Sequence, residues 1–112
     1  MEKMVNKVEL NGFVGREPEV KTLSNGSKLT QFTLATDKFY KNEKTSEWVK
    51  NTTWHRIVLW NKVAEKAAET LKKGTRVLLK GMLVNRSFTD KDGNKRNIVE
   101  IQVNSFEPQL AA

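Results

Sequence analysis

The sequence predicts an all-β fold, a small barrel of five strands with one helix between the third and the fourth strand. Hydrophobic and polar residues alternate at every second position in five separate segments, as they do in half-buried strands. One further segment, residues 61–74, repeats its apolar residues at helical spacing instead. With 112 residues, 38% of them hydrophobic, the chain is long enough for one domain with a thin core.

The first two strands are predicted at residues 6–10 and 29–36. Val8 and Leu10 share one face of the first strand and charged side chains occupy the other, so this strand is expected to bury one face. A turn signal, Ser-Asn-Gly at residues 24–26, precedes the second strand.

A polar stretch, residues 37–52, separates the second strand from the third and is expected to form an extended hairpin tip. In the third strand, residues 53–60, Ile57 and Leu59 are good core residues on the same face. We therefore expect this face to line the barrel interior, with His55 pointing the same way.

The helix predicted over residues 61–74 carries its own start and stop signals. Asn61 is expected to cap the free N–H groups of the first turn, and Gly74 to end the helix in a left-handed conformation. The two lysines before Gly74 suit the negative end of the helix dipole. The predicted buried face consists of Val63, Ala67 and Leu71.

The last two strands are predicted at residues 76–88 and 95–105, joined by a turn at residues 90–93. Gly81 interrupts the fourth strand and indicates a bulge where a barrel wall bends sharply. Five strands with one helix after the third is the layout of the OB-fold, a partly open Greek-key barrel that binds oligonucleotides or oligosaccharides. A small sandwich could also use five strands, but the position of the helix favours the barrel.

Composition narrows the class of ligand and the location. Twenty Lys and Arg against thirteen Asp and Glu give a net charge of +7, which favours a polyanionic ligand, although a merely soluble surface would also fit the charge alone. Without cysteine the chain has neither a disulfide nor a thiolate metal site. No apolar run is long enough to span a membrane, and the first ten residues hold no apolar signal region, so we expect a cytoplasmic location.

The most informative residues lie on the face of the third strand opposite Ile57 and Leu59. This face carries Trp54, Arg56, Val58 and Trp60. Two indoles around a guanidinium suit stacked bases and a phosphate. The alternative is that the indoles form the core, or pack beneath a loop or against another subunit.

Aromatic residues beside cations at two hairpin ends extend this surface. Tyr40 is expected to stack on a base, while its neighbour Phe39 plugs the base of the hairpin. Phe88, two residues after Arg86, has the equivalent place at the end of the fourth strand. Trp48 fits either a stacking residue or an anchor of the hairpin on the barrel. The cations expected to neutralise phosphates are Lys7, Arg56, Lys62, Lys73 and Arg86.

The chain resembles the DNA-binding domain of the bacterial single-stranded DNA-binding proteins over roughly residues 4–107. The segments that carry the resemblance are residues 5–8, 15–20, 25–26, 33–36, 54–59, 72–74 and 89–93. The resemblance implies a homotetramer of OB-folds that binds single-stranded DNA in replication, recombination and repair. It also implies base-stacking positions at Tyr40, Trp54, Trp60 and Phe88. Two of these are usually Trp in the family and one is usually Phe, so the exchanges keep an aromatic face.

Family members usually continue into a flexible tail, rich in Gly, Gln and Pro, whose acidic tip recruits replication and repair proteins. Residues 108–112 form only a short C-terminal remnant after a DNA-binding domain expected at residues 1–107. The expectation of DNA coating therefore carries over, whereas partner recruitment is put in question, whether the tail is naturally absent or was removed.

Two other classes of function are weighed against this one. A nuclease-type OB enzyme needs a metal-binding carboxylate cluster or an activated base, but the acids are scattered and the only histidine is expected to point inward. We therefore expect no catalytic residue, metal site or cofactor. An RNA-binding or primosome-type accessory protein would share the charge and the fold, although nothing in the sequence indicates contacts to a 2′-hydroxyl.

The expected tetramer needs an apolar contact surface. Val5 and Leu29 fall opposite the predicted core faces of their strands, and Val84 lies near the predicted bulge. Together with His55, these residues are expected to form the subunit interface.

Overall fold

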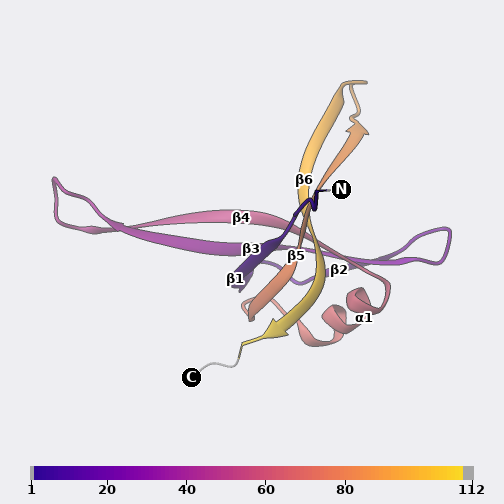
Figure 1. Cartoon of the computed structure of the whole chain (residues 1–112), viewed down its shortest axis with the longest axis horizontal. Helices are drawn as coiled ribbons and strands as arrows, with labels where there is room; N and C mark the ends of the chain where they lie inside the picture. The colour runs from indigo at the N-terminus through magenta and orange to yellow at the C-terminus, as the bar shows by residue number, and fades with distance from the viewer. Residues whose placement is uncertain (1, 110–112) are drawn as a thin grey trace.

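The computed structural model describes residues 2–109, and Figure 1 shows a barrel from which long hairpins project. The elements in chain order are β1 (Val8–Val14), β2 (Glu19–Thr22), β3 (Lys28–Lys41), β4 (Trp48–Trp60), α1 (Asn61–Thr70), β5 (Arg76–Thr89) and β6 (Lys95–Pro108). The five predicted strands and the helix are present in the predicted order, and β2 is a short additional strand. Of the predicted C-terminal remnant, Pro108 is the last residue of β6, and residues 110–112 lie outside the described part of the chain.

The sheet closes into a barrel because β1 pairs with both β5 and β3. The strand order is β1-β5-β6-β4-β3-β2, and the β1–β3 pairing joins the ring, so that β2 is added at the edge of β3. The pairings are antiparallel except that of β4 with β6, where Ile57 lies beside Ile101. This arrangement, with the helix between β4 and β5, confirms the predicted OB-fold.

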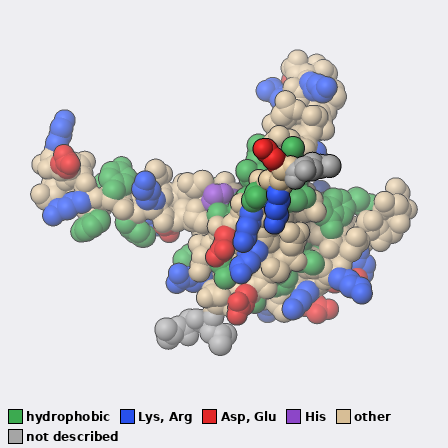
Figure 2. All heavy atoms as spheres, in the orientation of Figure 1, with side chains coloured by type: hydrophobic (Ala, Val, Ile, Leu, Met, Phe, Trp, Pro, Cys, Tyr) green, Lys and Arg blue, Asp and Glu red, His purple; other side chains and the backbone are tan. Residues whose placement is uncertain are grey.

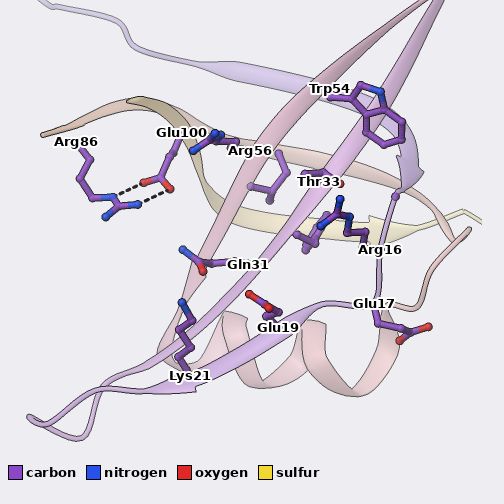
Figure 3. A pocket seen from close by; sticks show the side chains of 13 residues that line it. Arg16, Glu17, Glu19, Lys21, Gln31, Thr33, Trp54, Arg56, Arg86 and Glu100 are labelled. Carbon is purple, nitrogen blue, oxygen red and sulfur yellow. Dashed lines mark hydrogen bonds and ion pairs between the residues drawn. The ribbon is translucent and has the colours of Figure 1, made fainter. Parts of the chain in front are cut away.

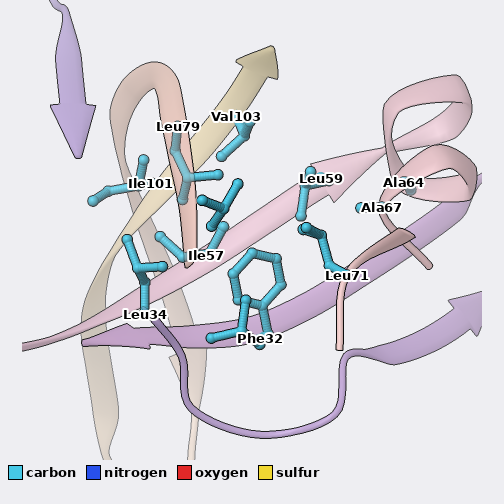
Figure 4. Close-up of a cluster of buried hydrophobic side chains, with 12 residues drawn as sticks. Phe32, Leu34, Ile57, Leu59, Ala64, Ala67, Leu71, Leu79, Ile101 and Val103 are labelled. Carbon is cyan, nitrogen blue, oxygen red and sulfur yellow. The ribbon is translucent and has the colours of Figure 1, made fainter. Parts of the chain in front are cut away.

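The barrel interior is filled from alternate positions of the long strands (Figure 4). Phe32 of β3 lies opposite Ile57 of β4, and with Leu34 and Leu59 they are all buried. The predicted inner face of the third strand is therefore confirmed. The other buried members of the core are Val14, Ala64, Ala67, Leu71, Val77, Leu79, Ile101 and Val103.

The helix packs against the sheet and ends earlier than predicted; of its predicted apolar face Ala67 is buried and Val63 half-buried, and Ala64, which was not predicted, is buried as well. Thr30 anchors it, since its buried hydroxyl donates to the carbonyl oxygen of Ala64 at 2.9 Å. The last helical residue is Thr70, because Leu71 already has an extended backbone (φ −98°, ψ 133°) and places its side chain in the core. Burying Leu71 in this way is incompatible with another helical turn.

The predicted signals at the two ends of the helix are therefore wrong. Asn61 does not cap the helix; its side-chain oxygen accepts the backbone N–H of Lys28 at 3.3 Å. Gly74 does have a left-handed φ of 87°, but it lies in the turn after the helix, where its N–H donates to the carbonyl of Val14. The two lysines before it are outside the last helical turn and do not meet the helix dipole.

Gly81 forms the predicted bulge. The register between β5 and β6 shifts between Lys80 and Gly81. A side chain at Gly81 would overlap with the backbone carbonyl of Gln102 on β6, so only glycine allows this close approach of the two strands.

The polar stretch predicted as a hairpin tip is mostly strand. β3 and β4 stay paired without a register shift out to Lys41 and Trp48, so only residues 42–47 form the turn. The resulting arm, residues 37–52, projects from the barrel (Figure 1). Together with the β5–β6 hairpin it raises the radius of gyration to 16.7 Å. A compact chain of this length would have a radius of about 13 Å.

Two apolar residues assigned to the outer surface by alternation are buried. Leu29 of β3 lies between β2 and β4, and Val58 of β4 lies between β3 and β6. Leu29 is thus unavailable for the predicted subunit contact, whereas Val5 is exposed and Val84 is half-buried.

Candidate nucleic-acid interface

A groove of about 760 Å³ crosses the barrel beside the loop that joins β1 to β2 (Figure 3). This loop, β2, β3 and β4 supply most of its lining, and β5 and β6 supply one residue each. Four cations and three carboxylates surround it, namely Arg16, Lys21, Arg56, Arg86, Glu17, Glu19 and Glu100. Trp54 adds an indole, so a stacking surface and several cations meet in one groove.

Trp54 owes its position to a glycine in the β1–β2 loop. The indole lies directly against Gly15, where even a Cβ atom would overlap with the ring and would lie 2.7 Å from the hydroxyl of Thr33. The backbone N–H of Gly15 donates to the carbonyl of Thr33 at 2.8 Å, which ties the loop to β3. The indole is 59% exposed and so keeps much of its surface for a ligand. Figure 3 shows it at one end of the groove.

Trp60 lies on the same face of β4 as Trp54 but outside the groove. Alternation along β4 places both indoles and Arg56 on the outer face, as predicted. The buried Val58 lies between Arg56 and Trp60, and Trp60 is 37% exposed at the start of the helix. The groove therefore brings together Trp54 and Arg56, and Trp60 forms a separate aromatic position on the same face.

An ion pair lies at the other end of the groove from Trp54 (Figure 3). Arg86 donates from Nε to Glu100 Oε1 at 3.1 Å and from Nη2 to Glu100 Oε2 at 3.4 Å. Glu100 is buried, whereas about half of the Arg86 side chain is exposed. Glu100 thus fixes the guanidinium at the groove and neutralises part of its charge.

The other two predicted stacking residues lie on the projecting hairpins. Tyr40 is on the arm, opposite Val49, and alternation places it on the face of the ribbon opposite to that of Trp54. Phe88 lies opposite Arg96 near the end of β5, on the same face as Arg86 by alternation. Both rings are exposed, and neither lines the groove.

Three of the predicted phosphate-binding lysines lie away from the groove. Lys7 precedes β1, Lys62 is in the first turn of α1, and Lys73 is in the turn after the helix. All three side chains are exposed. The backbone N–H of Lys73 donates to a carboxylate oxygen of Glu17 at 3.1 Å and joins this turn to the β1–β2 loop.

Sequence reasoning missed two cations of the groove, Arg16 and Lys21, together with the acidic partner of Arg86. β2 has only four residues and all of them are exposed, so it carries no alternation signal. Glu100 occupies one of the polar positions of an alternating strand, yet it is buried and forms an ion pair with Arg86. The segment 15–20 did carry a signal, because it belongs to the family resemblance.

His55 lies on the inner face of β4, as predicted, where the arm leaves the barrel. It is half-buried, and its Nε2 is 2.8 Å from the hydroxyl of Thr36 on β3. Burial lowers the pKa of the imidazole below its usual value of 6.5. The neutral form is therefore favoured in the fold.

Within residues 2–109, no three or more His, Cys, Asp and Glu side chains come together in a way that could hold a metal ion. The same residues include no helix with the length and apolar content needed to cross a membrane.

Comparison with known proteins identifies a family and a similar solved structure. The model of the single-strand binding protein family matches residues 5–109. A solved structure described as the Plasmodium falciparum SSB complex with ssDNA is similar, with a TM-score of 0.80 and 35% sequence identity. The match covers 96% of this chain and 96% of that chain.

Proposed function

We propose, because this chain belongs to the single-strand binding protein family, that it coats single-stranded DNA with little regard to base sequence. Bases stack on exposed aromatic side chains, and Lys and Arg neutralise the phosphates. The chain acts as a binding protein and not as an enzyme. It serves DNA replication, recombination and repair, the processes in which single strands are exposed. The cytoplasmic location expected from the sequence stays a prediction.

The observation that carries this proposal is the position of Trp54 in the groove. One side of the indole rests on Gly15 and much of the rest is exposed, beside the guanidinium of Arg56. A ring held in place loses little freedom when a base stacks on it, so more of the stacking energy appears as affinity. Every base has a flat face, which explains why such a surface tolerates any sequence.

The remaining aromatic residues extend the proposed path. Trp60 lies on the same face of β4, and Tyr40 and Phe88 lie on the two hairpins that project from the barrel. Phe88 continues the face of β5 that carries Arg86, whereas Tyr40 is a separate position on the side of the arm opposite to Trp54. Lys7, Lys62 and Lys73 would then contact phosphates outside the groove.

We further propose that four copies assemble. Met4, Val5, Leu83 and Val99 are exposed apolar side chains. The side-chain amide of Asn6 bonds both the N–H and the carbonyl of Leu83, at 3.0 and 2.8 Å, and so holds the N-terminal segment beside β5. An apolar group of this kind fits a subunit contact better than it fits water, and His55 contributes to a second contact.

Light scattering tests the assembly. We expect a particle of four chains of 12.8 kDa each at micromolar concentration, and loss of that particle when His55 is replaced by Asp. A particle of a single chain would contradict the proposal, and a dimer would leave only one of the two contacts.

Titration of the tryptophan fluorescence with an oligo(dT) of about 15 nucleotides, near the upper site size of one OB-fold, tests the function. We expect strong quenching and an affinity that falls with salt by about 0.7 log units per log unit for each phosphate contact. Duplex DNA of the same length should bind more weakly, because its bases are not free to stack. Equal affinity for the matching oligo(rU) would favour an RNA-binding accessory protein, and a flat salt dependence would contradict phosphate binding.

A further inference from the structure

The arm exposes two aromatic side chains beyond the proposed stacking positions. Phe39 is 61% exposed and Trp48 is 71% exposed, more than Trp54 in the groove. Phe39 therefore does not plug the base of the hairpin, and Trp48 does not anchor the arm on the barrel within this chain. Large apolar rings are costly to leave in water without a ligand, so this part of the molecule requires an explanation.

The strand register places these two rings on one face together with two lysines. Phe39 lies opposite Lys50, and Lys41 lies opposite Trp48. Each cross-strand pair thus consists of one aromatic residue and one lysine. The aromatic residue is on β3 in the first pair and on β4 in the second. Figure 2 shows hydrophobic and basic side chains side by side along the arm.

This face continues the outer face of β4. The β3–β4 register has no shift between the barrel and the turn. The side chains at positions 48, 50, 52 and 54, every second residue of β4, therefore lie on the same side of the ribbon. Six residues of strand correspond to about 20 Å from Trp48 to Trp54. The surface formed by Phe39, Lys41, Trp48 and Lys50, here called the arm face, therefore lies on the same side of the ribbon as Trp54, beyond the Asp37–Thr52 pair.

The charge of the arm face suits a polyanion. The one acid on this side of the ribbon, Asp37, accepts the hydroxyl of Thr52 at 2.6 Å, next to the barrel. The acids Glu43 and Glu47 lie in or next to the turn. A protein partner that covered the arm face would bury two lysines among aromatic rings, and such burial is costly unless the partner supplies matching acids.

We propose that the arm face is a second stacking surface, on which single-stranded DNA continues after it leaves the groove at Trp54. Phe39 and Trp48 stack on bases, and Lys41 and Lys50 contact the phosphates between them. This inference rests on the proposed function and adds two base-binding residues to it. It predicts that the arm contributes to binding only when the strand is long enough to reach it.

The test compares two lengths of oligo(dT), about 5 and about 15 nucleotides, which lie near the two ends of the site size of an OB-fold. The double variant Phe39→Ala/Trp48→Ala should bind the short strand like the wild type, because the groove is intact and holds a short strand best. It should bind the long strand more weakly, by about 5- to 150-fold for each base that no longer stacks on a ring. Asn51→Ala, which shortens an exposed side chain on the opposite side of the arm and away from Tyr40, is the matched control and should bind both lengths like the wild type.

A fluorescence measurement checks the same point without disturbing the arm. In the variant Trp54→Phe/Trp60→Phe, Trp48 is the only tryptophan and the other two positions keep an aromatic ring. The long strand should quench Trp48 strongly and the short strand only weakly.

The inference is overturned if Phe39→Ala/Trp48→Ala binds the long strand like the wild type. It is equally overturned if the long strand does not quench the fluorescence of Trp48. It is also overturned if the double variant changes the particle mass in light scattering, since the arm face would then be a subunit contact. Failure of the wild type to bind either strand would instead reject the proposed function itself. The two failures are therefore distinguishable.

Discussion

The hairpin of β3 and β4 has one face buried in the core and one face exposed to solvent. The inner face carries Phe32, Leu34, Ile57 and Leu59, all buried in the barrel. The outer face, displaced by one residue along the same strands, carries Trp54 and Arg56 in an open groove. Because side chains alternate along a strand, burial of the inner face fixes which side chains the outer face presents. The core thus determines the register of the binding surface, and the β1–β2 loop determines the position of its main ring.

The largest expected effect is on the free energy of unfolding, when a residue of the inner face of the β3–β4 hairpin is truncated. Leu59→Ala removes a fully buried side chain between β4 and the helix and leaves a cavity, so we expect the free energy of unfolding to fall by about 2–5 kcal/mol. The folded fraction should still bind oligo(dT) with wild-type affinity. Chemical denaturation followed by titration at low temperature measures both quantities. A loss of binding free energy as large as the loss in the free energy of unfolding would show that the inner and outer faces are not independent.

The next effect concerns the support of the binding face. Gly15→Ala places a Cβ atom against the indole of Trp54, so we expect the ring to move and affinity to fall by about 1–3 kcal/mol, as for loss of one stacked base. A double-mutant cycle with Trp54→Ala provides the control. If Gly15 acts through the indole, the double variant binds no more weakly than Trp54→Ala alone. Additive losses would show that the loop has a separate effect.

A smaller effect is expected from the ion pair at the far end of the groove. Glu100→Gln removes one negative charge beside Arg86 and leaves the guanidinium free to meet a phosphate. Affinity at low salt should rise, and the slope of log affinity against log salt should steepen by up to about 0.7. Titrations at four salt concentrations measure the slope. An unchanged slope would mean that Arg86 contacts no phosphate even when it is free.

The smallest expected effect is the pH dependence of stability caused by His55, which lies half-buried at the end of the inner face. Burial depresses the pKa of His55 in the fold, so the unfolded chain takes up a proton first as the pH falls. The contribution of His55 to stability is therefore complete above the unfolded pKa of about 6.5, declines as the pH falls from there towards the lower folded pKa, and changes no further below it. Denaturation curves between pH 8 and about 5 should show this decline, and His55→Gln should lack it over the same range. A decline of equal size in the variant would assign it to other groups.

The hydrophobic pattern was sufficient to predict the barrel and the orientation of β4. Ile57 and Leu59 are apolar enough to determine which face is inside, and Gly81 marked the bulge because no other residue fits so close to a neighbouring backbone. From that orientation Trp54, Arg56 and Trp60 followed on the outer face.

The features that were not predictable depend on contacts between distant segments. The arm is exposed on both sides, so its strands lack the alternation that reveals a half-buried strand. The helix ends where Leu71 enters the core, so packing in the barrel and not Gly74 determines its last residue. Val58 is buried because β6 returns beside β4 from more than forty residues later in the chain.

The most direct test of the central claim measures two free energies, that of unfolding and that of oligo(dT) binding, on Trp54→Ala and on Leu59→Ala. We predict a crossed result. Trp54→Ala should lose about 1–3 kcal/mol of binding with little change in stability, because its ring is mostly exposed. Leu59→Ala should lose stability and keep the affinity of its folded form. If Trp54→Ala instead destabilises the fold and binds oligo(dT) like the wild type, the indole is a packing residue and the account is contradicted.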